Sequence, residues 1–325
     1  MLSAAILAAS LMQAPPAPAP AMAPAQDLAQ GVTLIRGAIV PGRGPDGNTV
    51  VFDAREGLIV VDTGRHSWHS DAILAFARAR QRAVAAIVNT HWHLDHSSGN
   101  GRIKAVYPDA RVYTTNAVDR AMAPGGFIAR SLESSRAMME GDQLTDLQRE
   151  ELGVFFATMD HSDILRPDLV LDRSRRMRIA GKNFDVRVTD GAVTDADVWL
   201  YDRRSRIVVI GDLVTLPAPF FETACPDRWS AALDDVWATP FRIAVPGHGE
   251  PMTRDQFNLY RTAFNGFMAC VRSDAEAASC ASGWADGVSA LTQGQNGRPN
   301  AERYAAYYVG YLRENAFKSP DCLSS

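Results

Sequence analysis

The chain lacks several features that mark common classes of protein. Beyond its N-terminus it has no apolar run of the roughly eighteen residues needed to cross a bilayer, so no stable membrane span is expected. It has no stripe of basic residues and a net charge of −4, which argues against nucleic-acid binding. None of its four cysteines forms a C-x-x-C pair, so a cysteine-based zinc site is not expected. No protein partner is evident from the sequence, and we expect a small-molecule substrate.

Histidine is scarce in the chain, with seven residues in total, yet three of them fall within one short segment. Residues 90–96 read T-H-W-H-L-D-H, and the apolar run before them predicts a buried strand that ends in this loop. Imidazole and carboxylate groups suit zinc and iron at neutral pH. A tight loop can turn His91 and His93 to one side and Asp95 and His96 to the other. The segment therefore predicts one or two metal positions at the carboxyl end of a strand.

Residues 90–100 resemble the signature loop of the metallo-β-lactamase superfamily, whose pattern is H-x-H-x-D-H. Segments 59–64, 208–212 and 244–249 resemble further motifs of that family in the same order. The resemblance covers about residues 31 to 270. It implies an α/β fold, a four-layer αββα sandwich, here with a helical insertion and a C-terminal helical extension.

The resemblance also implies a set of metal ligands. It assigns metal binding to six residues of this chain, which are His91, His93, Asp95, His96, Asp212 and His248. The family pattern places His91 and His93 on a first metal, makes Asp212 a bridge between both metals, and leaves the other three to the second. The implied cofactor is zinc, as one ion or two, with iron or manganese as alternatives.

One position departs from the family pattern. The family has a further histidine between the first cluster and the bridging aspartate, but residues 191–197 read G-A-V-T-D-A-D and place Val193 there. Valine cannot ligate a metal, so we expect one tightly bound metal at the second position and a weak or empty first position. Asp190, Asp195 or His66 could substitute if their loops bend inward. The opposing interpretation is that Val193 marks a relic that no longer catalyses.

The expected function is hydrolysis by metal-bound hydroxide of an ester, lactone, thioester or amide. Asp95 is the predicted catalytic residue, because it can orient the nucleophile or carry its proton. If the first metal position is empty, His91 or His93 could act as the base instead. β-Lactams are an option, although Asp212 stands where many β-lactamases carry cysteine or serine. The alternatives are redox chemistry at the metal and a metal- or ligand-binding module without turnover.

The N-terminus and the cysteines both favour export to the periplasm or secretion. Residues 1–25 resemble a signal peptide with an A-x-A cleavage site, although no Lys or Arg precedes the apolar segment. We expect residues 26–325 to form one domain. Cys270 and Cys280 are close enough in sequence to pair, which would leave Cys225 to pair with Cys322; four free thiols are the alternative.

The periodicity of apolar residues predicts the order of helices and strands. A helical insertion is expected over about 116–165 and a helical extension over about 252–325. Strands are expected at 31–40, 48–62, 85–90, 111–114, 177–180, 184–189, 198–202, 207–211 and 242–245. Further helices are expected at 70–82, 228–239, 254–273 and 300–315.

Several side chains outside the metal motif also carry expectations. We expect Asp62 to orient the ligand loop through hydrogen bonds, and residues 217–221 to form an apolar wall of the cleft. His66 and His69 are expected at the start of a surface helix, with a place in the pocket as the alternative. The methionines and phenylalanines of the insertion, and the tyrosines at 304–311, are expected to serve as core.

Overall fold

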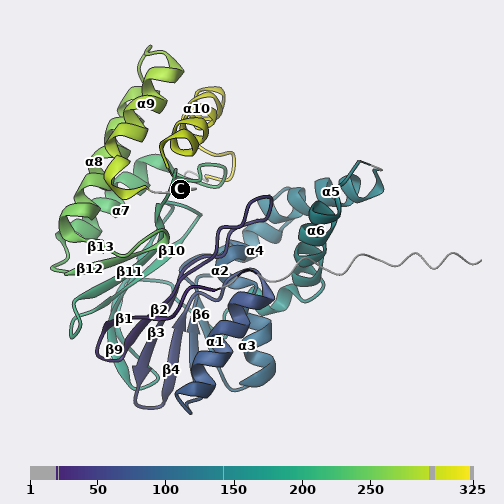
Figure 1. Cartoon of the computed structure of the whole chain (residues 1–325), viewed down its shortest axis with the longest axis vertical. Coiled ribbons are helices and arrows are strands. Elements are labelled where there is room, and N and C mark those ends of the chain that lie inside the picture. Colours follow the sequence, from purple (N-terminus) through teal and green to yellow (C-terminus); the bar gives the residue numbers. More distant parts are fainter. Residues whose placement is uncertain (1–19, 21, 142, 293–296, 323–325) are drawn as a thin grey trace, which may run out of the picture.

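The computed structural model describes residues 20, 22–141, 143–292 and 297–322 and has the predicted α/β sandwich (Figure 1). Two sheets pack face to face, and helices cover the outer face of each. The side chains between the sheets are mainly Val, Ile, Leu and Phe, the residues that suit a pleated, buried surface. Because both sheets are covered on both faces, the buried strands read as apolar runs rather than alternating patterns.

The first sheet has seven strands in chain order, antiparallel up to the fourth strand and parallel beyond it. They are β1 (Gln26–Ala29), β2 (Val32–Ile35), β3 (Thr49–Ala54), β4 (Gly57–Val61), β5 (Val84–Val88), β6 (Arg111–Thr114) and β7 (Leu169–Val170). The parallel arrangement brings the carboxyl ends of β4 and β5 to the same edge. The histidine loop follows β5 at that edge.

The second sheet has six strands in the order β13-β12-β11-β10-β9-β8, of which β11 and β12 are parallel. They are β8 (Arg175–Ile179), β9 (Lys182–Thr189), β10 (Asp197–Asp202), β11 (Ile207–Thr215), β12 (Ile243–His248) and β13 (Met252–Thr253). The carboxyl ends of β11 and β12 carry Asp212 and His248 to the edge where the histidine loop lies.

The outer layers and the insertion are helical. The helices are α1 (Ser67–Ala79), α2 (Leu94–Ser97), α3 (Asn100–Val106), α4 (Ala117–Met122), α5 (Phe127–Glu140), α6 (Asp146–Met159), α7 (Pro226–Ala238), α8 (Arg254–Val271), α9 (Ala277–Gly287) and α10 (Arg298–Glu314), with short 3-10 turns at Ser162–Leu165 and Ser289–Leu291. Helices α1 and α3 cover the first sheet, whereas α7 to α10 cover the second. Helices α5 and α6 extend sideways from the body (Figure 1).

The structure corrects some predicted boundaries. The strand expected over 31–40 ends at Ile35, and residues 36–47 form a loop instead. The strand expected over 48–62 is a hairpin of β3 and β4 that turns at Arg55 and Glu56. Sequence periodicity did not reveal helix α9, whose alanine, serine and glycine give little contrast between faces.

The cysteines form the two expected pairs. Cys270 and Cys280 are bonded with 5.5 Å between their Cα atoms, and Cys225 and Cys322 are bonded with 5.1 Å between theirs. These pairs are compatible with an extracellular protein. The predicted signal segment 1–25 lies mostly outside the described residues. No helix of the described ranges is both long and apolar enough to cross a membrane.

Candidate metal centre

Asp62, directly after β4, holds the histidine loop in place as the sequence predicted. Its Oδ1 atom accepts a hydrogen bond from the backbone N–H of Thr90 at 2.7 Å. Its Oδ2 atom accepts from the Thr90 hydroxyl at 2.7 Å and faces His96 Nδ1 at 2.8 Å. The carboxylate thus fixes both ends of the loop through three donors, and its own backbone takes the left-handed region with φ of 61°.

The hydrogen bonds around each histidine indicate which ring nitrogen carries a proton and which one faces the cluster. The Thr90 hydroxyl has one proton and gives it to Asp62, so the contact of 2.9 Å between His91 Nδ1 and Thr90 Oγ1 needs a proton on that nitrogen. Nε2 of His91 then carries a lone pair. By the same reasoning Nδ1 of His96 donates to the Asp62 carboxylate, and its Nε2 atom faces the cluster.

His93 is held by a different partner. The Thr223 hydroxyl donates to the carbonyl oxygen of Val193 at 2.7 Å, so His93 Nε2, which lies 2.9 Å from that hydroxyl, must be the donor in their contact. Nδ1 of His93 is left with its lone pair. Each of the three histidines is therefore set in one orientation and one tautomer, as metal-binding histidines require.

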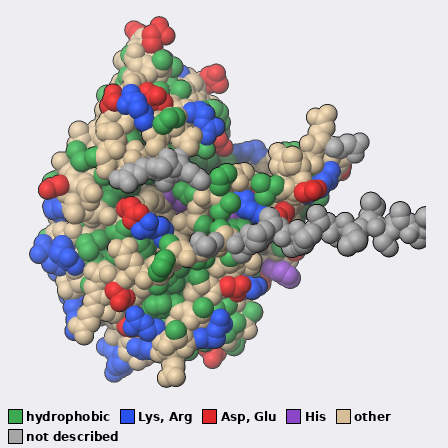
Figure 2. Space-filling view, in the orientation of Figure 1, with side chains coloured by type: hydrophobic (Ala, Val, Ile, Leu, Met, Phe, Trp, Pro, Cys, Tyr) green, Lys and Arg blue, Asp and Glu red, His purple; other side chains and the backbone are tan. Residues whose placement is uncertain are grey.

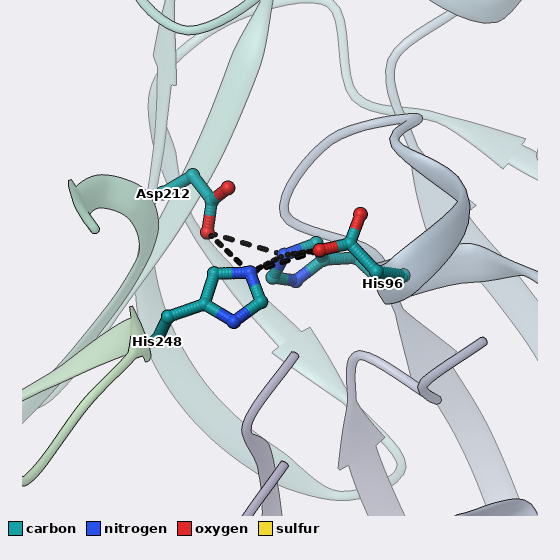
Figure 3. Close-up of side chains that lie close together, drawn as sticks. His96, Asp212 and His248 are labelled. Atoms are coloured by element: carbon teal, nitrogen blue, oxygen red, sulfur yellow. Dashed lines mark hydrogen bonds and ion pairs between the residues drawn. The ribbon is translucent and has the colours of Figure 1, made fainter. Parts of the chain in front are cut away.

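Four of the predicted ligands come together in one buried group. Their ligand atoms lie within 4.8 Å of one another, and the four residues are Asp95, His96, Asp212 and His248. Nε2 of His248 is 2.9 Å from Asp95 Oδ2, and Nε2 of His96 is 3.1 Å from Asp212 Oδ1. Figure 3 shows Asp212 and His248 pointing toward each other beside His96.

The other two predicted ligands form a second group that shares Asp212. Ligand atoms of His91, His93 and Asp212 also lie within 4.8 Å of one another, and all three residues are buried. Within the described residues, His91 Nε2 and Asp212 Oδ1 are buried without a hydrogen-bond partner. The Nε2 lone pair of His91 carries a desolvation cost unless a cation lies near it, whereas Asp212 Oδ1 has the His96 ring 3.1 Å away as an ion-pair partner. These donor sets therefore fit metal ions.

The first group has the protonation state that a metal needs. Burial lowers the pKa of His91 well below its ordinary value and lowers the pKa of His93 to about 4, so both imidazoles are neutral at pH 7. Burial would raise the pKa of Asp212, but the nearby histidines hold this pKa below its usual range. Two neutral nitrogens and one carboxylate are ready to ligate.

The four-residue group holds protons that a metal must displace. Burial would lower the pKa of His96 and His248, but the carboxylates of Asp212 and Asp95 raise both. Burial would likewise raise the pKa of Asp95, but the charges and hydrogen bonds of these two histidines lower it well below its usual value. Metal binding at this group should therefore weaken as the pH falls.

Two glycines allow the loops to approach this closely. A Cβ atom on Gly47 would lie 2.4 Å from the His96 ring, and one on Gly247 would lie 1.9 Å from Asp212 Oδ1. The N–H of Gly47 donates to the carbonyl oxygen of Asp95 at 2.8 Å. The next residue, Asn48, donates to the carbonyl oxygens on both sides of the Gly247–His248 segment. The end of the 36–47 loop thus joins the two ligand-bearing edges.

A cavity of about 870 Å³ opens beside the metal centre. Its wall includes Asp95, Asp212 and His248, together with residues of the 36–47 loop, α5, α6, the segment after β11, and α10. Pro217, Ala218 and Phe220 line it, so the predicted apolar wall is present, but Phe221 is buried in the core.

Three predictions about nearby residues were wrong. His66 and His69 do not lie on the surface, because both are almost fully buried. His66 lies between the carboxylates of Asp46 and Glu151, so it is not a substitute ligand. Asp195 pairs with Arg120 and does not belong to either ligand group.

A fourth prediction that was wrong concerns side chains expected to serve only as core. Phe127 and Phe155 of the insertion line the cavity, as do Tyr304 and Tyr308 of α10. Helical periodicity marks apolar faces but does not distinguish a face that covers a cavity from one that covers a core. Sequence reasoning also missed Thr223 and Asn48, because a lone polar residue in a loop has no pattern.

The profile of the Metallo-beta-lactamase superfamily matches residues 42–248, which is more than half of the chain. The chain belongs to the metallo-β-lactamase superfamily. Among solved structures, a metallo-β-lactamase family protein from Thermus thermophilus is similar with a TM-score of 0.54 and 16% identity, over 89% of this chain and 95% of that one. At this identity the likeness supports the fold alone.

Two curated members of the superfamily are similar in sequence. A linear primary-alkylsulfatase from a Pseudomonas strain is 26% identical over 222 residues, which are 62% of this chain and 41% of that protein. A hydroxyacylglutathione hydrolase from a Synechococcus strain is 41% identical over 56 residues, which are 17% of this chain and 21% of that protein. The matched regions thus span less than half of either relative.

Proposed function

We propose that this chain is a metal-dependent hydrolase that cleaves an ester, thioester, lactone, sulfate ester or amide bond, β-lactams included. The observation that carries the proposal is the pair of buried ligand groups that share Asp212, beside a cavity whose wall includes Asp95, Asp212 and His248. The names of the two curated relatives, an alkylsulfatase and a hydroxyacylglutathione hydrolase, support hydrolysis as the reaction class.

We propose Asp95, His96, Asp212 and His248 as the ligands of one tightly bound metal. Zinc fits this set of nitrogen and oxygen donors, and iron or manganese are alternatives. A bound metal would supply a nucleophile from water at neutral pH and stabilise negative charge on the scissile group. We propose that His91, His93 and Asp212 form a weaker first position.

We attribute this weakness to Val193, which the resemblance aligns with a histidine of the family. Two contacts of Thr223 support the alignment, because its hydroxyl donates to the Val193 carbonyl oxygen and also contacts His93. The backbone N–H of Val193 donates to Asp197 within the same loop. The buried isopropyl group offers no donor there.

Asp95 is the residue we propose to move the proton. It is the most exposed of the four ligands, with 16% of its side chain accessible, and it lines the cavity. Its Oδ2 atom faces His248 and His96, which leaves Oδ1 to accept a proton from the attacking water. His91 and His93 each use one ring nitrogen for a contact with a threonine hydroxyl, and we propose that the other nitrogen faces the first metal position.

We further propose that residues 26–325 form one exported domain after removal of a signal peptide over 1–25. Two features support this: both sheets contribute to one continuous core, and both disulfides lie within that domain. The helices of 116–165 are its insertion, and those of 252–325 are its extension. The site of action would be the periplasm or the exterior of the cell.

Hydrolysis by the zinc-loaded chain across a panel of chromogenic esters, thioesters, lactones and β-lactams, with alkyl sulfates assayed by sulfate release, tests the proposal. Asp95→Asn should lower kcat at least about a hundredfold, since it removes the proton acceptor. Asp71→Asn is the matched control, because Asp71 is exposed and pairs with Arg102 far from the centre. Unchanged turnover in Asp95→Asn would contradict the assigned role. Metal binding without turnover on any substrate would favour the alternative, a binding member of the fold.

A further inference from the structure

The cavity beside the metal centre has an uneven distribution of charge. Among its described lining residues the carboxylates are Asp95 and Asp212, which belong to the proposed metal centre. The charged residues outside that centre are all arginines, namely Arg43, Arg65 and Arg303. No such bias is seen on the surface in Figure 2, where acidic and basic side chains are mixed. A cavity with this lining favours a ligand that carries negative charge.

The rest of the lining is largely apolar and aromatic. The ring of His93 contacts Phe220 at 5.4 Å, and Phe220 contacts Tyr308 of α10 at 6.4 Å between ring centroids. On the other side, Trp92 contacts Phe127 of α5 at 5.8 Å. These rings form a continuous wall that leads from the metal centre toward the two helical segments. Such a wall buries an alkyl or aryl chain, which is stabilised by about 0.8 kcal/mol for each CH₂ group removed from water.

Two of the three arginines are poor candidates for holding an anion. Arg43 is already bound to two carboxylates, with contacts of 2.8 Å to Glu150 and 2.9 Å to Glu151. Arg303 is exposed on α10, where water weakens its attraction for an anion. It has no carboxylate partner within the described residues, but it lies at the solvent side of the wall.

Arg65 differs from both. Its side chain is 22% exposed, and its Nε atom is buried without a hydrogen-bond partner in the described part of the chain. The nearest carboxylate oxygen, Oε2 of Glu151, is 4.0 Å away and already accepts from the N–H of Gly44 at 2.8 Å. Glu151 also binds Arg43 and His66. The Arg65 guanidinium therefore has donors to spare in a partly desolvated place, where a charged hydrogen bond is strong.

We propose that the cavity selects an anionic amphiphile, with an apolar chain against the aromatic wall and its carboxylate or sulfate group bound by Arg65. This selection deepens the hydrolase function proposed above and rests on the same cavity. A guanidinium can donate two parallel hydrogen bonds to either anion. Arg65 is thus a specificity-determining residue rather than a catalytic one.

Direct binding tests this assignment without depending on turnover. The zinc-loaded full chain is titrated with octanoate, octyl sulfate and 1-octanol, and binding is followed by calorimetry and by tryptophan fluorescence, to which Trp92 in the cavity wall contributes. We expect both anions to bind at least about tenfold more tightly than the alcohol, which corresponds to about 1.4 kcal/mol. A preference for one anion over the other identifies the head group.

Substitutions assign that preference to a residue. Arg65→Gln should lower the affinity for both anions about tenfold or more relative to octanol, and Arg65→Lys should restore part of it. Arg303→Gln removes the same charge from an exposed place in the same wall, so it should change the ratio by less than about threefold. Thermal unfolding of each variant shows that the fold is retained.

Three outcomes would overturn the proposal: octanol binding as tightly as the anions, Arg65→Gln weakening all three ligands equally, or anion preference surviving in Arg65→Gln. The last would mean that the metal centre holds the anion. Failure of the hydrolase function has a different signature, in which anion-selective binding and its loss in Arg65→Gln persist while no substrate is cleaved.

Discussion

Asp62 controls the histidine loop although it is not a proposed ligand. Its two carboxylate oxygens receive the Thr90 N–H, the Thr90 hydroxyl and His96 Nδ1. The Thr90 hydroxyl in turn sets the tautomer of His91. One carboxylate therefore orients a histidine in each of the two ligand groups, which makes it a more general support than any single ligand.

Asp62→Asn should lower zinc affinity about tenfold to a hundredfold, since an amide group at Oδ2 would face two donors and release the His96 ring. The zinc dissociation constant, measured by competition with a coloured chelator, reports the effect. Asp53→Asn serves as the control, because Asp53 lies on β3 of the same sheet but binds Arg80 and not the loop. Equal zinc affinity in Asp62→Asn and wild type would show that the histidine loop keeps its conformation without the Asp62 carboxylate.

At this scale the sequence named the candidate ligands, which the structure brings together in two groups, but it named few of the residues that support them. The H-x-H-x-D-H segment, Asp212 and His248 could be named because the family pattern fixes their spacing, and Asp62 followed from its place beside them. Thr223 could not be named, because its role depends on the fold bringing residues 130 positions apart into contact. His66 was misplaced because its carboxylate partners come from a distant loop and helix.

Among the elements, the 36–47 loop is the one that links the cavity to the insertion. It reaches α6 through Arg43 and the N–H of Gly44, which both bind Glu151. It reaches the start of α1 through Asp46, which accepts from the N–H groups of Arg65 and His66. The insertion therefore forms one wall of the cavity. Through Glu151 it also holds the 36–47 loop, which forms another wall.

His66 lies at the centre of these contacts between the 36–47 loop, α1 and α6, and it should make their contribution to stability depend on pH. Its ring nitrogens face Asp46 at 3.0 Å and Glu151 at 3.2 Å, with Arg43, Arg65 and His69 as the other titratable neighbours. Burial lowers the pKa of His66, but the two carboxylates outweigh burial and raise it above 6.5. Only the protonated ring can donate to both. The stabilisation is therefore complete below pH 6.5 and is lost as the pH rises through the folded pKa.

His66→Gln should lower the free energy of unfolding by about 2 kcal/mol at pH 6, because one hydrogen bond to a charged group is lost, and by less at pH 9. Urea unfolding at the two pH values measures the difference. His161→Gln is a matched control, since His161 is exposed in the same insertion. If the loss of unfolding free energy in His66→Gln grew with pH, the contacts of His66 with Asp46 and Glu151 would not depend on the protonated ring.

Among the helices and strands, too, the sequence predicted some correctly and others wrongly. Strands that are mostly apolar, such as β5 and β10, were placed within two residues because burial on both faces gives a strong apolar signal. Residues 36–40 were taken for part of a strand because Ile39 and Val40 are apolar, yet these two residues line the cavity instead. An apolar residue that faces a ligand site looks the same in sequence as one in a sheet.

At the scale of the whole molecule, the longer disulfide bonds the segment after α10 to the start of α7. Cys225 lies at the start of α7 and donates its N–H to the carbonyl oxygen of Ala192, next to Val193. Its partner Cys322 is 97 residues away, whereas Cys270 and Cys280 are 10 residues apart. The longer bond therefore constrains more of the unfolded chain and also anchors the loop beside the first ligand group.

Replacing both Cys225 and Cys322 by alanine should lower the free energy of unfolding by about 5 kcal/mol, against about 3 kcal/mol for Cys270 and Cys280, by the loop-length relation. Guanidinium unfolding of the two double variants measures this order. A larger cost for the shorter bond would mean that loop length does not set the stabilisation.

Metal content per chain tests the central claim most directly. Elemental analysis of the chain purified without chelator should give about one zinc, held by the four-residue group, and Val193→His should raise the value to about two by completing the first group. Two metals in the wild type would mean that the first position is complete without a histidine at residue 193. No metal after zinc is added would contradict the metal-dependent hydrolase itself.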